Sequence, residues 1–167
     1  IQCSRYNIED MYKELMGIVA SVKNPYISKL LNAFFVEDTE FIAKFKACAA
    51  GKSVHHGFMG GLLEHSLSVT RLCDSMAKNY DYLNRDLLVA CAMLHDCGKV
   101  KELSPFPKND YTDEGNFLGH IVMGYEMVSE KMRAIPDFPE LLKAEIGHCI
   151  LAHHGQLEYG SPKKPSI

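Results

Sequence analysis

Apolar residues recur at intervals of three and four along most of the chain, which is the spacing of one face of an α-helix. Asn7, Asp38 and Asn84 stand at the starts of three such segments and can accept hydrogen bonds from first-turn amides. The pattern therefore predicts an all-α fold. The expected helices span residues 8–22, 26–36, 39–49, 62–79, 85–97, 117–134 and 140–154.

Two stretches interrupt the helical pattern. Residues 53–61 hold His55, His56 and three glycines. Residues 99–116 are polar and rich in turn-forming residues, so we expect a long loop or a small hairpin there. Long loops inside compact domains often carry function.

The composition is that of a single globular domain. Hydrophobic residues make up 47% of the chain, and no apolar run approaches the ~20 residues that cross a membrane. The net charge of −3 argues against a broadly basic nucleic-acid-binding surface, although not against a local basic path. Six cysteines without a Cys-x-x-Cys pair fit reduced thiols. We therefore expect a cytoplasmic protein with no membrane association.

The main candidate for a functional site is the motif His-Asp-Cys-Gly-Lys at residues 95–99, which follows an apolar helical run. His95 and Asp96 provide an imidazole nitrogen and a carboxylate oxygen, and both suit a divalent transition metal. Gly98 is expected to end the helix in the left-handed conformation. On its own, the His-Asp pair is equally compatible with simple capping of a helix end.

Three further histidines share this inward position. His65, His120 and His153, like His95, each fall on the apolar stripe of a separate expected helix. The stripes are Leu62, His65, Val69, Leu72 and Met76; Leu88, Cys91 and His95; Phe117, His120, Gly124 and Met127; and Leu142, Ile146, Cys149 and His153. Buried imidazoles need partners, and we expect Asp96, which directly follows His95, to be the one carboxylate that adjoins them. A shared metal centre would satisfy all of them together.

These ligands, with His154 beside His153, are too many for one tetrahedral zinc with an open position. They predict two transition-metal ions, drawn from Mn, Fe, Co, Ni and Zn, that Asp96 and a water bridge. Two such ions are an arrangement for in-line displacement at phosphorus with a bridging hydroxide as the nucleophile.

The order His65, His95-Asp96, His120, His153-His154 resembles the HD superfamily of metal-dependent phosphohydrolases. Closer similarity is to the YhaM-type bacterial 3′-to-5′ exoribonucleases. It extends over roughly residues 40–165 and is carried by HHGFMGGLLEH at 55–65, LHDCGK at 94–99, YTDEG at 111–115, LGHI at 118–121 and HHGQLEYGSP at 153–162. The resemblance implies an HD-domain helical bundle, a divalent metal with Mn most typical, and trimming of single-stranded RNA from its 3′ end.

Two departures from that family are visible. The family normally carries an OB-type nucleic-acid-binding domain before the HD domain, and it closes the metal site with an aspartate on a later helix, whereas Asp137 is the last aspartate here. We therefore expect residues 1–167 to be a single HD-type domain cut from a longer protein. Within it, we expect a scaffold at 1–50, a metal-site core at 51–155 and a tail at 156–167.

The resemblance also implies roles for individual residues. The metal ligands would be His65, His95, Asp96, His120, His153 and His154. Asp96, Lys99 and His154 would act in catalysis, with Lys99 neutralising charge on the phosphoryl oxygens. His55, His56, Lys99 and Tyr159 would contact the substrate.

Two other functions remain open at this stage. One is an HD phosphohydrolase that acts on a nucleotide or a cyclic dinucleotide, and the other is a non-enzymatic regulatory module. A panel of RNA and nucleotide substrates separates the first from an exoribonuclease, and metal analysis separates the second. The sequence leaves the oligomeric state open.

Overall fold

The computed structural model describes residues 3–52, 57–156 and 165, and confirms the all-α prediction for them. Over these residues the extended structure consists of two isolated β-bridges. No helix in the described part is both long and apolar enough to cross a membrane. The helices are α1 (Ile8–Ala20), α2 (Pro25–Asn32), the π-helical turn η1 (Ala33–Glu37), α3 (Thr39–Ala47), α4 (Gly61–Asn79), α5 (Arg85–Leu94), α6 (Lys99–Glu102), α7 (Asp113–Ala134) and α8 (Glu140–Ala152).

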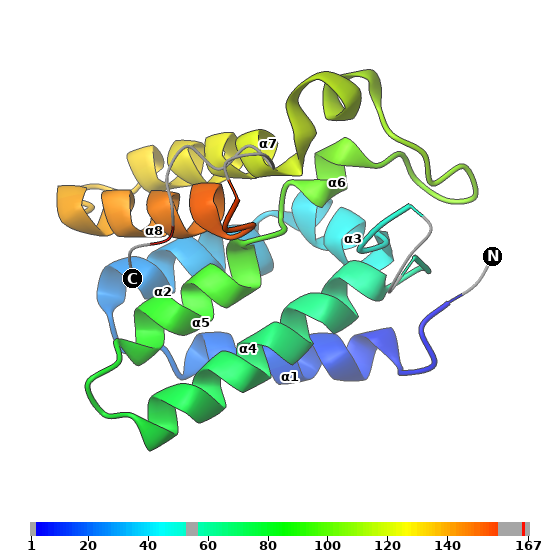
Figure 1. Ribbon diagram of the computed structural model, residues 1–167. Coiled ribbons are helices and arrows are strands. Elements are labelled where there is room, and N and C mark those ends of the chain that lie inside the picture. The colour runs from blue at the N-terminus through cyan, green and yellow to red at the C-terminus, as the bar shows by residue number, and fades with distance from the viewer. Residues whose placement is uncertain (1–2, 53–56, 157–164, 166–167) are drawn as a thin grey trace.

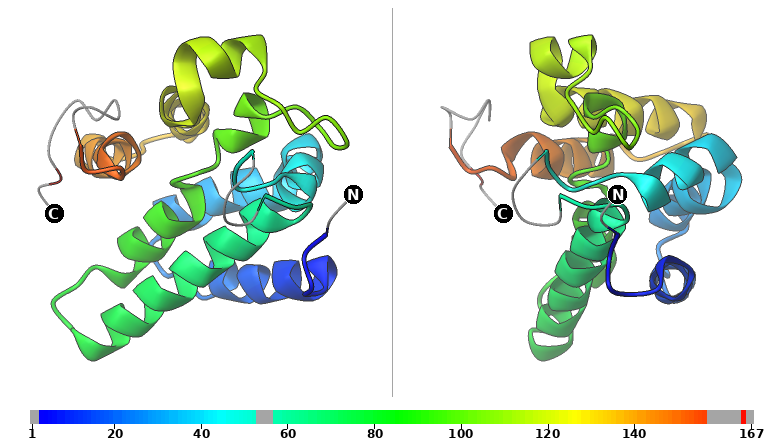
Figure 2. Two further views of the ribbon diagram at one scale, coloured as in Figure 1. Left: turned by 45° about the vertical axis from the view of Figure 1, so that its right-hand side comes forward. Right: turned by 90° about the vertical axis from the view of Figure 1, so that its right-hand side faces the viewer.

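The helices form two groups that meet at the end of α5. Helices α4 and α5 pack against each other as an antiparallel pair, and α1 lies along α4 (Figure 1). Helices α7 and α8 lie side by side, as the end-on view of both in Figure 2 also shows. Helix α8 contacts α5, and the short α6 packs against α7. The turn between α5 and α6 therefore lies where both groups converge.

The polar caps and the aromatic core follow from the sequence. The predicted caps are confirmed, because Asn7, Asp38 and Asn84 each accept a hydrogen bond from a first-turn amide, at 2.9, 3.0 and 3.2 Å. Aromatic rings from η1 and α3 pack with centroids 5.0–6.3 Å apart, which is the usual range for stabilising aromatic pairs. This core holds α1 to α3 against α4 and α5. The rings belong to Phe34, Phe35, Phe41 and Phe45.

The stretch predicted as a loop is more helical than expected. Residues 99–102 form α6, and α7 begins at Asp113 because the Thr112 hydroxyl accepts the Gly115 amide at 2.9 Å. The predicted hairpin is reduced to one isolated bridge between Leu103 and Tyr111.

Two of the predicted apolar stripes were wrong in part. Leu72 and Met76 of α4 are 64% and 51% exposed, and Phe117 of α7 is 88% exposed. The inward face of α4 instead carries Ser66 and Thr70 alongside leucines, and the Thr70 hydroxyl donates to the Ser66 carbonyl at 2.7 Å. A buried hydroxyl that bonds its own helix costs little, so hydrophobicity alone selects the wrong face.

Candidate metal centre

Asp96 is the centre of a cluster of imidazoles. Its side chain is only 6% exposed, and it lies in the turn between α5 and α6. Its Oδ2 lies 3.3 Å from the Nε2 atoms of both His65 and His95. Its Oδ1 lies 3.3 Å from Nε2 of His120 and 3.4 Å from Nε2 of His153. Each carboxylate oxygen therefore faces its own pair of imidazoles.

His154 joins the second pair, with its Nε2 atom 3.2 Å from Nε2 of His120. The cluster divides into two groups whose potential ligand atoms lie within 4.8 Å of one another. One group is His65, His95 and Asp96, and the other is Asp96, His120, His153 and His154. Asp96 belongs to both.

Helix ends bring these side chains together. His95 and His153 are the C-cap residues that directly follow α5 and α8, and His65 lies near the start of α4. His120 follows Gly119, whose φ of 75° kinks α7. Since residues at a helix end can turn inward without interrupting the hydrogen bonds of the helix, four elements can supply one site.

Gly98 does not end the helix in the left-handed conformation, so that prediction was wrong. Its φ of −63° and ψ of −17° are right-handed, and α5 ends earlier, at Leu94. Gly98 is instead a point of close approach to α7. A Cβ atom there would lie 2.0 Å from the carbonyl oxygen of His120 and 2.6 Å from the amide nitrogen of Gly124.

Backbone carbonyls orient two of the imidazoles. Nδ1 of His95 lies 2.6 Å from the Ala92 carbonyl oxygen, and Nδ1 of His153 lies 2.6 Å from that of Ile150. Because a carbonyl oxygen only accepts, each Nδ1 carries a hydrogen. Nε2, the ring nitrogen nearer Asp96, is then the atom that would ligate a metal.

Glu102 is a second carboxylate of the site, and the sequence analysis missed it. Its Oε2 accepts the backbone amide of His120 and lies 2.8 Å from Nδ1 of the same residue. The expectation that Asp96 alone adjoins the histidines was therefore wrong. The sequence offered one indication of this role, because Glu102 is the single acidic residue between positions 97 and 109, close after the His-Asp motif. Glu102 lay within the predicted loop, however, and only the packing of α6 on α7 places its carboxylate at His120.

Both carboxylates are held in the anionic form. Burial alone would raise the pKa of Asp96, but the interactions with the four surrounding imidazoles outweigh burial and hold that pKa well below its usual range. Burial likewise opposes ionisation of Glu102, and the hydrogen bond from His120 lowers its pKa. Burial would lower the pKa of His120, yet Asp96 and Glu102 raise it to about 9. Burial and the neighbouring His153 and His120 lower the pKa of His154.

The donor set fits a divalent metal. Nε2 of His153 is buried and makes no hydrogen bond within the described residues. The Nε2 atoms of His65 and His95 lie 3.2 Å apart, as do those of His120 and His154. In each pair at most one hydrogen fits between the two nitrogens, so at least one Nε2 offers a lone pair. Imidazole nitrogens around a shared carboxylate are characteristic ligands of transition metals. The cluster is therefore able to hold a divalent metal ion.

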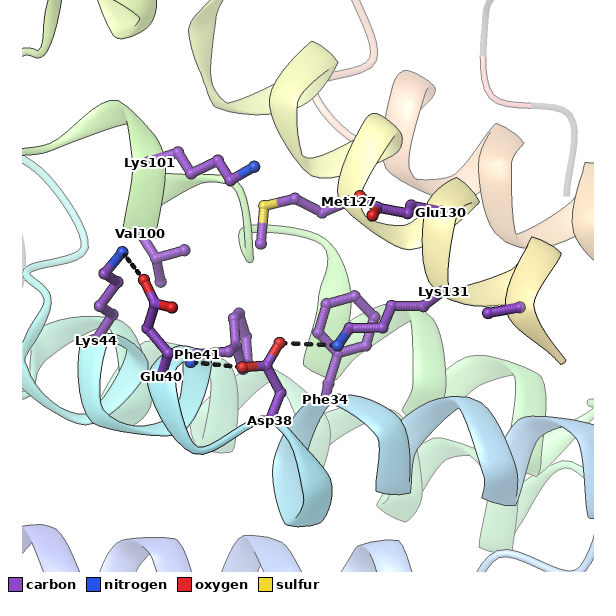
Figure 3. Close-up of a pocket in the computed structure, with 11 residues that line it drawn as sticks. Phe34, Asp38, Glu40, Phe41, Lys44, Val100, Lys101, Met127, Glu130 and Lys131 are labelled. Atoms are coloured by element: carbon purple, nitrogen blue, oxygen red, sulfur yellow. Dashed lines mark hydrogen bonds and ion pairs between the residues drawn. The ribbon is translucent and has the colours of Figure 1, made fainter.

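Of the neighbouring lysines, Lys99 faces the cluster. Its Nζ lies 3.5 Å from Oδ2 of Asp96 and donates a hydrogen bond to the Ala50 carbonyl. Lys101 lies about 200° further around the helix. Its side chain lines a separate cavity of about 490 Å³ with Phe34 and Met127, which none of the described histidines lines (Figure 3). The predicted substrate contacts His55, His56 and Tyr159 lie outside the described residues.

We expect Glu102→Gln to weaken Mn²⁺ binding by about 10–100-fold, the usual effect of losing a carboxylate that orients a ligand histidine. The amide cannot provide the anionic acceptor that fixes the hydrogen of His120 on Nδ1. Titration of Mn²⁺ followed by calorimetry measures the change. Glu114→Gln, at an exposed position in the first turn of α7, is the matched control and should bind Mn²⁺ as the wild type does. Equal affinities for the two variants would exclude a role for Glu102.

Comparison with known proteins agrees with this geometry. A family model described as HD domain matches residues 62–166. The chain is 40% identical over 162 residues to the 3′-5′ exoribonuclease YhaM of Bacillus subtilis (strain 168), covering 95% of this chain and 49% of that protein. It is 35% identical over 162 residues to the protein of the same name from Oceanobacillus iheyensis, again covering 95% and 49%. The chain thus spans about half the length of the curated relatives it matches. No solved structure matches it.

Proposed function

The chain belongs to the HD-domain family, and from this premise we propose that it is the catalytic part of a metal-dependent 3′-to-5′ exoribonuclease. One observation carries the proposal. A single buried carboxylate presents each of its two oxygens to a separate set of imidazoles. The names of the relatives support RNA as the substrate.

We assign the site to two ions, with manganese as the first choice. His65, His95 and Oδ2 of Asp96 would hold one ion. Oδ1 of Asp96, with His120, His153 and His154, would hold the other. When bound, such a pair supplies Lewis acidity toward a phosphodiester and lowers the pKa of the attacking water. All of these residues lie within 51–155, which we propose as the metal-site core, with 1–50 as its scaffold.

The residues around the ions have distinct tasks. Asp96 remains anionic and supplies the charge that holds two cations close together. Lys99 donates one N–H group to Ala50 and lies beside Asp96, so its remaining N–H group can meet a phosphoryl oxygen. Its charge opposes the negative charge that develops there during displacement. His154, whose pKa is lowered, is neutral at pH 7 and can ligate or donate to a phosphate oxygen.

The decisive experiment is a time course on a 5′-labelled single-stranded RNA oligomer with Mn²⁺. We expect a ladder of products that shortens from the 3′ end by one nucleotide at a time. A chelator should stop the reaction, and added Mn²⁺ should restore it. Activity should fall steeply with salt as contacts to phosphates are screened.

A mononucleotide and a cyclic dinucleotide are assayed beside the RNA. If the protein leaves RNA intact but hydrolyses either small substrate, the exoribonuclease assignment is wrong and a small-substrate HD phosphohydrolase replaces it. If Mn²⁺ binds but none of these substrates is hydrolysed, the chain is not by itself a catalytic unit.

A further inference from the structure

Three cysteines line one cavity beside the metal centre. Cys73 of α4, Cys91 of α5 and Cys149 of α8 surround a space of about 440 Å³, and all three are half-buried. The candidate ligands His95 and His153 line the same cavity. A small oxidant that enters this space therefore reaches thiols and metal ligands together.

Cys91 and Cys149 form a pair within this group. Their thiols are hydrogen-bonded to each other across the contact between α5 and α8. Cys91 lies four residues before His95, and Cys149 lies four residues before His153. Residues at this spacing occupy the same helix face one turn apart. Each of the two thiols therefore lies one helical turn before a candidate metal ligand, Cys91 before His95 and Cys149 before His153.

We propose that Cys91 and Cys149 are a peroxide-sensitive dithiol that closes a reversible disulfide between α5 and α8 beside the metal centre. All six cysteines are free thiols in the structure, so this is its reduced form. Nothing in the proposed hydrolytic reaction uses these two residues.

Both thiols are reachable by an oxidant in this cavity, because Cys91 and Cys149 line it together. The thiol that reacts first becomes the sulfenic acid, and its neighbour is the resolving thiol.

The chemistry balances with hydrogen peroxide as the oxidant. One of the two thiols loses its proton, and the thiolate attacks one peroxide oxygen. The O–O bond breaks, and the departing hydroxide takes a proton to leave as water. The first cysteine is then a sulfenic acid. The second sulfur loses its proton and attacks the sulfenic sulfur, the S–O bond breaks, and the hydroxide takes a proton to leave as a second water. Two thiols are oxidised to one disulfide, and one peroxide is reduced to two waters.

Closing this bond should disturb the metal centre. A covalent bond brings the two sulfurs closer than a hydrogen-bonded contact does, so α5 and α8 must shift relative to each other. His95 at the end of α5 faces Oδ2 of Asp96, and His153 at the end of α8 faces Oδ1. A relative shift of the two helices changes both sets of ligands at once. This consequence rests on the proposed metal function, whereas the disulfide itself does not.

The other cysteines provide internal controls. Cys73 lines the same cavity but takes no part in the hydrogen bond between Cys91 and Cys149. Cys97 is fully buried and does not line this cavity, and its Sγ lies 3.9 Å from the Gly124 carbonyl oxygen. Cys73→Ala should therefore oxidise as the wild type does, while Cys91→Ala and Cys149→Ala should not form the disulfide.

The test begins with chelator-treated protein exposed to stoichiometric hydrogen peroxide. We expect the titratable thiols to fall from six to four and the mass to fall by two hydrogen atoms. Peptide mapping should recover the Cys91–Cys149 link, and a dithiol reductant should reverse it. Circular dichroism confirms that each alanine variant is folded. A disulfide that contains Cys73, or sulfinic acids without a disulfide, overturns the proposal.

Mn²⁺ affinity is then measured on the reduced and oxidised forms. We expect oxidation to weaken binding at least tenfold in the wild type and in Cys73→Ala, with recovery after reduction. Binding to Cys149→Ala should be insensitive to peroxide. Unchanged affinity in the disulfide form overturns the coupling to the metal centre. Failure of the reduced wild type to bind Mn²⁺ refutes the metal assignment instead, and the mapping result still decides the disulfide.

Discussion

Asp96→Asn is expected to lower Mn²⁺ affinity by more than about 100-fold, beyond the usual loss from removing a supporting residue, and to abolish RNA cleavage. Each oxygen of Asp96 faces two imidazoles, so one substitution removes a ligand from both groups. An asparagine has the same shape but no charge. Its NH₂ group would also donate to an Nε2 lone pair that the metal needs. Calorimetric titration with Mn²⁺ and the RNA time course measure the two effects.

The controls separate this result from a general loss of charge or fold. Asp137→Asn is matched in chemistry and lies at an exposed residue with a φ of 60°, a conformation that asparagine tolerates well. It should leave both measurements unchanged. His154→Ala should be milder, because His154 is exposed and belongs to one group only. A stronger defect in His154→Ala than in Asp96→Asn would reverse the roles assigned to them.

The helices were predictable because their signals are local. Asn7, Asp38 and Asn84 begin helices through hydrogen bonds to residues three positions away, and a sequence displays that spacing directly. The inward histidines were predictable for a related reason. A histidine on an apolar stripe near a helix end is unusual, and four of them together indicate one site. The structure brings all four to Asp96.

What the sequence did not reveal depends on contacts between distant elements. Glu102 belongs to the site only because α6 packs on α7, and no spacing in the sequence relates it to His120. Leu72 and Met76 seemed inward because the periodicity of α4 fits two neighbouring faces. Which of those faces is buried depends on the helices that pack against α4. These include α1 and α5, and Ser66 and Thr70 are on the buried side. Gly98 was interpreted as a helix end, whereas its role is set by the backbone of α7.

Gly98→Ala is the second large effect we expect, with a loss of about 3 kcal/mol or more in the free energy of unfolding, as for severe overpacking. The added Cβ would lie 2.0 Å from the carbonyl oxygen of His120 and 2.6 Å from the amide nitrogen of Gly124. Both atoms are backbone, so no side-chain rotation relieves the clash. The turn must move away from α7. For a domain of this size, the loss corresponds to a melting temperature lower by about 6–12 °C.

Gly17→Ala is the matched control, because Gly17 lies within α1 and a Cβ there meets nothing within 4 Å. It should raise stability by up to about 1 kcal/mol, the helix preference of alanine over glycine. Urea and thermal unfolding of both variants, without metal, measure the difference. A Gly98→Ala protein as stable as the wild type would show that the approach of the turn to α7 is not close in solution.

The same substitution also distinguishes a structural from a chemical contribution to metal binding. Gly98 touches the backbone of His120, and the two residues on its N-terminal side are Cys97 and Asp96. Displacing the turn therefore moves the Asp96 carboxylate away from one of its imidazoles without substituting any candidate ligand. We expect Gly98→Ala to lower Mn²⁺ affinity and stability together, whereas Asp96→Asn should lower affinity and leave a folded protein. If Gly98→Ala lost stability but kept its affinity for Mn²⁺, the metal centre would not depend on the packing of this turn against α7.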